Sequence, residues 1–407
     1  MSEPNVGYWR PLKVMTILGT RPEIIRLSRT MARLSEFVDH VLVHTGQNWD
    51  PTLNEIFFSD LDLPQPDYYL GVDTSSLGAT VGGILIEVER VLREELPDAV
   101  LILGDTNSAI AAYIARRMKI PVYHMEAGNR CFDRNVPEET NRRLVDHLAD
   151  FNLCYTEHAR RNLLAEGLAA RRIYVTGSPM REVLEHYRES IKNSTILDKL
   201  GLEHRRYILA SLHREENVDN AASLDRLVRA LERLGQQHDC PVIISTHPRT
   251  RKRLDALQAE VGVAGENSQA TSNLRWLEPF GFHDYNRLQQ SALCVLSDSG
   301  TLAEESSMLG FPGVTPRFSI ERPEALDSGA VIACGTDPDD ILRAVHATIQ
   351  QVTQGSTVTA APDGSVVPGD YCIDNTSQRV VNLILGTARL SNAWDGIRMN
   401  TGSISRD

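Results

Sequence analysis

The sequence predicts an α/β protein with two doubly wound parallel sheets, and three observations lead to this prediction. Short runs of β-branched and aliphatic residues alternate with amphipathic helical segments, which is the pattern of β-α-β units. The length of 407 residues exceeds what one hydrophobic core usually organises and is typical of two or three domains. Strongly polar residues directly follow many of the apolar runs, at the sheet edge where such proteins bind ligands.

The first half of the chain supplies the strands of one sheet. Six apolar runs are candidates: Val14–Leu18, His40–His44, Ala99–Leu103, Pro121–Met125, Phe151–Tyr155 and Arg172–Val175. A polar, helix-rich passage around residues 192–195 follows them. We therefore expect a Rossmann-like N-terminal domain over residues 1–190.

The second half supplies the strands of another sheet. Four apolar runs are candidates: Tyr207–Ser211, Pro241–Ser245, Ala292–Leu296 and Val331–Cys334. They predict a second Rossmann-like domain over residues 191–375, facing the first across a central cleft. Residues 376–392 are expected to form a helix that packs back on the N-terminal domain, and residues 393–407 a flexible tail.

Composition excludes several classes of protein. A formal net charge of −12 argues against a nucleic-acid partner, because a duplex-binding surface needs a basic excess. No apolar stretch approaches the roughly 20 residues that cross a bilayer, and the N-terminus lacks an export signal, so we expect a cytoplasmic protein. The six cysteines lie far apart without zinc spacing and are interpreted as reduced core thiols. No metal is expected.

Two segments could hold phosphate. Residues 19–23, Gly-Thr-Arg-Pro-Glu, end a strand and open a helix with Arg21 beside it; a purely structural turn is the alternative. Ser299 and Gly300 begin a later helix, where free backbone N–H groups favour a diphosphate; a capping box is the alternative. Glu305 could accept ribose hydroxyls, and Arg322 could bind a phosphate. Neither dinucleotide nor P-loop fingerprint occurs, so no redox cofactor is expected.

Acidic residues gather after the strands of the first half. Asp105, Glu126, Glu138 and Glu139 lie at strand ends or at a helix start, with His213 expected to face them from the second domain. Such groups are costly to bury unpaired, so packing alone explains them poorly. The alternatives are helix caps and ion pairs, and for Glu139 a solvated position beside Glu138.

Seven motifs together resemble the non-hydrolysing UDP-N-acetylglucosamine 2-epimerases, in the same order along residues 13 to 350. They are Gly19-Thr20-Arg21-Pro22-Glu23, Gly104-Asp105-Thr106, His124-Met125-Glu126-Ala127-Gly128, Pro137-Glu138-Glu139-Thr140-Asn141-Arg142, His213-Arg214-Glu215-Glu216-Asn217, Ser297-Asp298-Ser299-Gly300 and Glu321-Arg322-Pro323-Glu324. The resemblance implies a glycosyltransferase-B-like fold, a UDP-sugar substrate and a homodimer.

Roles carry over from the resemblance motif by motif. It implies that Asp105, Glu126 and Glu138 are catalytic acid/base residues and that His213 acts near the diphosphate. It implies a UDP-binding set as well: Arg21, Arg26, His247, Tyr285, Ser299, Gly300, Glu305 and Arg322. A lone aromatic such as Tyr285 is also a common core residue.

Departures from the family pattern bear on the substrate. The usual lysine is Arg26 here, the family's Gln-His-Arg-Glu reads Gln47-Asn48-Trp49-Asp50, and the loop 128–137 looks short. These features are similar to the branch that converts UDP-2-acetamido-2,6-dideoxy-L-talose to UDP-N-acetyl-L-fucosamine for surface polysaccharides such as capsule and O-antigen. UDP-N-acetylglucosamine is the alternative substrate. A hydrolysing 2-epimerase, a glycosyltransferase on the same architecture and a non-catalytic nucleotide-sugar sensor are the rival functions.

Overall fold

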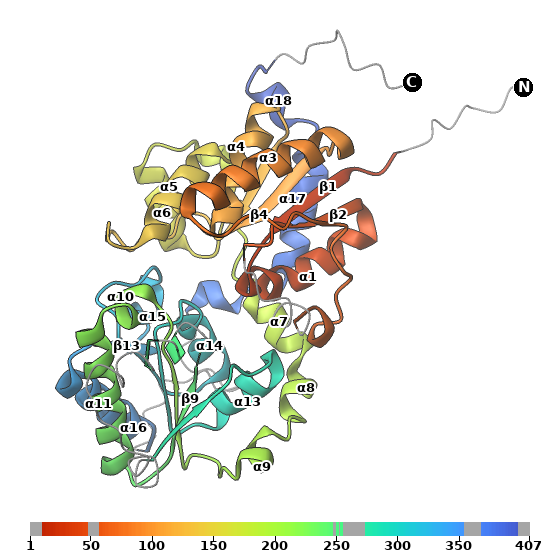
Figure 1. Ribbon diagram of the computed structural model, residues 1–407. Helices are drawn as coiled ribbons and strands as arrows, with labels where there is room; N and C mark the ends of the chain where they lie inside the picture. Colours follow the sequence, from red (N-terminus) through yellow and green to blue (C-terminus); the bar gives the residue numbers. More distant parts are fainter. Residues whose placement is uncertain are drawn as a thin grey trace, which may run out of the picture. The chain divides into compact units, whose positions relative to one another are not determined.

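The computed structural model describes residues 10–47, 57–246, 250–251, 253–254, 273–353 and 368–397 (Figure 1). The chain forms two compact units. Unit 1 consists of Met1–Asn129, Asp133–Val183 and Ile373–Asp407, and unit 2 of Arg130–Phe132 and Leu184–Cys372. The sequence suggested boundaries at 190 and 375 instead. Most of the expected tail lies outside the described residues.

Unit 1 contains a seven-stranded parallel sheet of order β3-β2-β1-β4-β5-β6-β7. Its strands are β1 (Lys13–Leu18), β2 (Asp39–His44), β3 (Tyr68–Tyr69), β4 (Ala99–Leu103), β5 (Val122–Met125), β6 (Phe151–Cys154) and β7 (Ile173–Val175). The strand order reverses direction between β1 and β4, which makes their carboxyl ends the expected ligand site.

Helices cover both faces of this sheet. They are α1 (Arg21–Phe37), α3 (Leu77–Glu95), η1 (Asn107–Ile110), α4 (Ala111–Arg117), α5 (Pro137–Leu148), α6 (Glu157–Ala165), η2 (Ala170–Arg172), α7 (Met180–His186), which runs on into unit 2, α17 (Thr376–Thr387) and α18 (Ser391–Trp394). One core forms where apolar side chains of α3 and α4 pack on β1, β2 and β4. Helix α17 contacts α1, so the end of the chain belongs to unit 1 (Figure 1).

Unit 2 contains a six-stranded parallel sheet of order β10-β9-β8-β11-β12-β13. Its strands are β8 (Ile208–Ser211), β9 (Val242–Ser245), β10 (Leu274–Leu277), β11 (Cys294–Ser297), β12 (Gly313–Thr315) and β13 (Val331–Ala333). Here the order reverses between β8 and β11, and their carboxyl ends mark a second expected ligand site.

The helices of unit 2 also form two layers. They are α8 (Arg188–Lys192), α9 (Ile196–Leu200), α10 (Glu215–Val218), α11 (Ala221–Gln237), α13 (Phe282–Ser291), α14 (Leu302–Leu309), α15 (Pro323–Asp327), α16 (Pro338–Thr353) and η3 (Gly369–Cys372). Helices α11 and α16 pack on one face of the sheet, and α9, α13 and α14 on the other (Figure 1). Two Rossmann-like α/β units are therefore confirmed.

The sequence prediction missed three strands, β3, β10 and β12. Strand β3 has two residues, β10 is only partly buried, and β12 has three residues that begin with a glycine. The expectation of core thiols holds for Cys154, Cys240 and Cys294, whereas Cys372 is exposed. Within the described part of the chain, no helix is long and apolar enough to cross a membrane.

Candidate active site

Two of the predicted acidic residues meet at the carboxyl ends of neighbouring strands. Asp105 follows β4 after Gly104, and Glu126 directly follows β5. Gly104 has a φ of +71°, and a Cβ atom there would lie 3.7 Å from Glu126 Oε2. Glu126 itself has a φ of +66°, a conformation that non-glycine residues rarely adopt and that is concentrated at functional sites.

An arginine from another element holds each of these carboxylates. Arg142 of α5 donates to Asp105 Oδ2 from Nη2 at 2.7 Å and from Nε at 3.0 Å. Arg26 of α1 forms an ion pair with Glu126. Both guanidinium groups are buried, whereas the side chains of Asp105 and Glu126 remain 27% and 13% exposed. A buried arginine thus holds each carboxylate, while part of the carboxylate side chain remains exposed.

Helix α5 contributes the other two predicted acids. Glu138 lies in its first turn and is partly buried. Glu139 is buried and accepts hydrogen bonds from Arg142 at 3.1 Å and from Arg143 at 3.0 Å. The solvated position considered for Glu139 is therefore wrong. Its buried carboxylate pairs with Arg142, the same arginine that holds Asp105.

Glu23 is a further buried acid that the sequence did not single out as a site residue. Its carboxylate accepts hydrogen bonds from the Gly19 N–H and from the hydroxyl groups of Thr20 and Thr106. Burial raises the pKa of Glu23 to about 7, although these donors oppose the shift. Glu23 thereby ties the loop after β1 to the loop of Asp105 after β4.

The second site begins with His213 and Asp298, at the ends of β8 and β11. Asp298 is fully buried, and its Oδ1 lies 3.0 Å from His213 Nδ1. It also accepts hydrogen bonds from the backbone N–H groups of His213 and Arg214 and from the Asn217 amide. Burial alone would raise the pKa of Asp298, but His213 and these donors overcome it and lower the pKa to about 2.

Asp298 therefore orients His213. The ionised carboxylate accepts a hydrogen bond from the Nδ1–H group, which leaves Nε2 for a ligand, and the His213 side chain is 42% exposed. Asp298 is part of the motif of residues 297–300, but the sequence alone did not predict that it pairs with His213.

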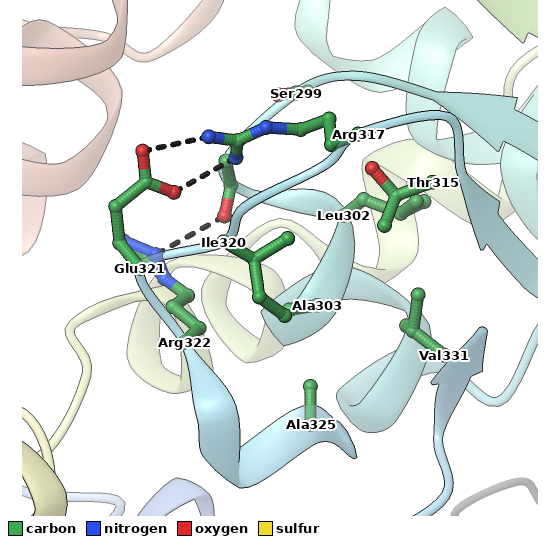
Figure 2. A pocket seen from close by; sticks show the side chains of 11 residues that line it. Ser299, Leu302, Ala303, Thr315, Arg317, Ile320, Glu321, Arg322, Ala325 and Val331 are labelled. Carbon is green, nitrogen blue, oxygen red and sulfur yellow. Dashed lines mark hydrogen bonds and ion pairs between the residues drawn. The ribbon is translucent and has the colours of Figure 1, made fainter. Parts of the chain in front are cut away.

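A small pocket opens beside this pair, at the start of α14 (Figure 2). Ser299, Gly300 and Arg322 line it, together with apolar side chains of α14, α15 and β13. Arg322 donates to the Gly300 carbonyl at 3.1 Å and forms an ion pair with Glu304 at 3.2 Å. The first turn of α14 and a fixed arginine thus meet at one place, an arrangement that favours an anion.

Arg317 and Glu321 face each other across the loop that bounds this pocket (Figure 2). Their two parallel hydrogen bonds are 2.8 and 2.9 Å long, and Arg214 reaches the same Glu321 carboxylate at 3.1 Å. Both side chains of the bidentate pair are buried. The sequence did not single out Arg317, although such a pair fixes the loop that carries Arg322.

The remaining predicted UDP ligands have separate surroundings. Glu305 is buried on α14 and accepts a hydrogen bond from the Gln289 amide at 2.7 Å. Tyr285 on α13 is a partly buried member of an apolar cluster in unit 2. The Arg21 guanidinium lies 5.3 Å from the Phe57 ring centroid in unit 1. His247 lies outside the described residues.

The fold and these residues define a class of protein, an α/β protein with arginine-held carboxylates at the carboxyl ends of β4 and β5 and a small pocket beside the carboxyl end of β11. Comparison with known proteins specifies the class further. The family model described as UDP-N-acetylglucosamine 2-epimerase matches residues 31–385. The chain therefore belongs to the UDP-N-acetylglucosamine 2-epimerase family and is an isomerase, a UDP-sugar 2-epimerase.

Solved structures agree with this assignment. The structure of UDP-N-acetylglucosamine 2-epimerase from Rickettsia bellii is 40% identical, with a TM-score of 0.86 over 96% of this chain and 100% of that chain. A Methanocaldococcus jannaschii enzyme of the same name, solved in complex with UDP-GlcNAc and UDP, is 33% identical, with a TM-score of 0.82 over 92% of this chain and 100% of that one.

A curated relative shows that the family has further branches. The UDP-2,3-diacetamido-2,3-dideoxy-D-glucuronate 2-epimerase of Pseudomonas aeruginosa is 34% identical over 84% of this chain and 94% of its own length. Family membership therefore leaves the particular sugar open.

Proposed function

We propose that the chain inverts C2 of a UDP-linked 2-acetamido sugar by eliminating UDP and adding it back, without hydrolysis. The hydrogen on C2 has no neighbouring carbonyl, so a carboxylate cannot remove it directly. When the C1–O bond breaks, its electron pair leaves with UDP and C1 gains oxocarbenium character, which acidifies this hydrogen. Its removal in an anti elimination leaves a 2-acetamidoglycal. Protonation of C2 on the opposite face and return of UDP to C1 give the epimer.

Asp105, Glu126 and Glu138 act as the general acids and bases in this proposal. A mechanism that removes a proton from one face of the ring and adds one to the other needs more than one such group. The observation that carries the proposal is that Asp105 and Glu126 follow adjacent strands with their orientation fixed by Arg142 and Arg26. Arg26 accordingly serves the sugar side of the reaction through Glu126, in addition to the UDP contact that the family resemblance implies.

Most of the residues proposed to bind the departing diphosphate lie in unit 2. Arg322, the Gly300 N–H and the Ser299 hydroxyl would stabilise negative charge that develops on UDP, which is the largest catalytic contribution expected in such a reaction. The Ser299 N–H, expected to be free, instead donates to Ser297 Oγ at 3.1 Å. His213, which Asp298 orients at Nδ1, would contact a phosphate oxygen through Nε2. Arg21 and His247 would complete the phosphate contacts.

The nucleoside is assigned to the neighbouring helices of unit 2. Glu305 would accept the ribose hydroxyl groups, with its second oxygen already held by Gln289. Tyr285 would lie against the uracil. These assignments rest on the family resemblance.

Two UDP-sugars are candidates for the substrate. The departures at Arg26 and at residues 47–50 favour UDP-2-acetamido-2,6-dideoxy-L-talose, which would give UDP-N-acetyl-L-fucosamine. The names of the similar solved structures favour UDP-N-acetylglucosamine equally well. We further propose, on the resemblance alone, that the enzyme works as a cytoplasmic homodimer, which light scattering of the purified protein would test.

Incubation of the purified protein with each UDP-sugar alone, followed by proton NMR at C1 and C2, tests the proposed function. An epimerase converts one substrate to its C2 epimer and reaches equilibrium with the UDP-sugar total unchanged. A steady release of UDP and free sugar would reveal a hydrolysing enzyme. Unchanged C2 configuration with both sugars would contradict the proposal and favour a transferase or a sensor.

A further inference from the structure

His124 is a fully buried histidine that no catalytic step uses. It lies in β5, two residues before Glu126. Its Nε2 is 2.8 Å from the Gly104 carbonyl oxygen, and its Nδ1 is 2.9 Å from Oδ1 of Asp146, which is also fully buried. A carbonyl only accepts hydrogen bonds, so Nε2 carries a hydrogen. Asp146 also accepts both hydrogen bonds of the Gly128 N–H, at 3.2 Å, and its close contact with Nδ1 does not have the geometry of a hydrogen bond.

The contacts of this pair with Gly104 and Gly128 lead to the two loops that carry proposed acid/base residues. Gly104 directly precedes Asp105. His124 and Gly128 flank Glu126 on its two sides. The pair therefore links the backbone of the Asp105 loop to both ends of the Glu126 turn, which has the rare positive φ described above.

Helix α5 extends the same connection. Glu138, Arg142 and Asp146 follow one another at intervals of four residues, which places them along one side of the helix. Arg142 holds the Asp105 carboxylate, and Asp146 holds His124 one turn later. Helix α5 thus carries Glu138 and helps to position Asp105 and Glu126.

We propose that His124 and Asp146 are positioning residues, a buried pair that fixes the loops of Asp105 and Glu126 in the geometry that proton transfer at C2 requires. The inference rests on the proposed acid/base roles of these two carboxylates. It assigns no contact with the substrate to either member of the pair. Its consequence is that disturbing the pair slows the chemical step more than it weakens binding.

Three conservative variants separate the contacts. His124→Gln keeps a donor near the Nε2 position toward Gly104 and loses the Asp146 contact. His124→Asn keeps a donor near the Nδ1 position toward Asp146 and loses the Gly104 contact. Asp146→Asn preserves shape and removes charge. Because a misplacement of about 1 Å costs about 100-fold in rate, we expect kcat to fall by about that factor in each variant, with KM changed less than about threefold.

His40→Gln is the matched control. His40 lies in β2, a strand of the same sheet, and both of its ring nitrogens have partners, Thr16 Oγ1 at 2.8 Å and Ser35 Oγ at 3.1 Å. It contacts no acid/base loop. Its kcat and KM are expected to stay close to those of the parent enzyme, although it loses a similar set of polar contacts.

The outcomes are distinct. Lower kcat in the folded variants, with unchanged KM and unchanged UDP affinity by calorimetry, supports the inference. Parent-like kcat in all three variants overturns it, as does a kcat loss of equal size in His40→Gln. If none of the three variants folds, the pair is a folding element and the inference is also overturned. A parent enzyme that epimerises neither UDP-sugar would instead contradict the proposed function.

Discussion

Arginine–carboxylate pairs dominate the chemistry of this protein at the scale of single residues. Asp105 and Glu126 each accept from an arginine whose side chain is 4% or 6% exposed. A buried guanidinium with fixed donors restrains a carboxylate more tightly than a flexible ammonium does. The orientation of these two proposed acid/base groups is therefore fixed before a substrate binds.

Arg142→Lys tests this restraint. Lysine keeps the charge but cannot reproduce the two donors that reach Asp105 Oδ2, so we expect kcat to fall by about 100-fold. Arg143→Lys is the matched control on the same helix, because Arg143 is 43% exposed and pairs with Glu139 and Glu166. Steady-state kinetics measure both variants. Equal rates for the two would show that the pair with Asp105 does not orient it.

Asp298→Asn is expected to change how stability depends on pH. The folded-state pKa of Asp298 is about 2, below its ordinary value of 3.8. The ionised group therefore stabilises the fold above pH 3.8, by roughly 2 kcal/mol, and this stabilisation is lost as the pH falls toward 2. The variant should melt at a lower temperature than the parent at pH 6, and the difference should shrink by pH 3.

Asp225→Asn is the control for this pH series. Asp225 is 50% exposed and pairs with Arg229 on the same helix, so its substitution should shift the melting temperature little at any pH. Parallel melting curves for Asp298→Asn and the parent across the pH range would contradict the role given to Asp298.

The residues of both sites could be predicted from the sequence only in part. Polar side chains after apolar runs identified Asp105, Glu126 and His213, because parallel strands gather their carboxyl ends at one edge. Their partners could not be found this way. Arg142 is 37 residues from Asp105, and Asp298 is 85 residues from His213, so each pairing exists only once the elements are packed.

At the scale of elements, the sequence predicted the central strands β1, β4, β5, β8 and β11, and also the edge strands β7 and β13. The run Ala99–Leu103 matches β4 residue for residue, because five consecutive buried apolar residues leave few alternatives. Strands β3 and β10 lie at sheet edges, where one side needs no apolar neighbour. Their polar and aromatic sequences therefore carry no periodic signal.

The C-terminal segment provides a test at this scale. Gly177 follows β7 with a φ of +85°, and a Cβ atom there would lie 2.6 Å from Ile373 Cβ, just before α17. Gly177→Ala should therefore lower the free energy of unfolding by roughly 2 kcal/mol. Gly82→Ala is the matched control within α3, where nothing lies within 4 Å. It should raise stability by about 1 kcal/mol.

Calorimetric melting of the two glycine variants measures this difference. Opposite shifts in melting temperature would support the docking of the C-terminal segment onto β7 and α1. A Gly177→Ala variant as stable as Gly82→Ala would show that residues near 373 do not pack there.

At the scale of the whole molecule, the two units divide the proposed chemistry. Unit 1 carries the carboxylates that we propose move a proton, and unit 2 carries most of the groups that we propose stabilise a departing diphosphate. Neither set suffices alone, because the hydrogen at C2 becomes acidic only when the C1–O bond breaks. The account therefore depends on reversible departure of UDP during every turnover.

Oxygen isotope exchange tests that dependence most directly. The UDP-sugar is labelled with ¹⁸O at the oxygen that joins C1 to the β-phosphate, incubated with the enzyme and followed by ³¹P NMR. The account predicts that the label spreads to the non-bridging oxygens of the β-phosphate at a rate comparable to epimerisation. Complete epimerisation with all of the label still bridging C1 and phosphorus would contradict it.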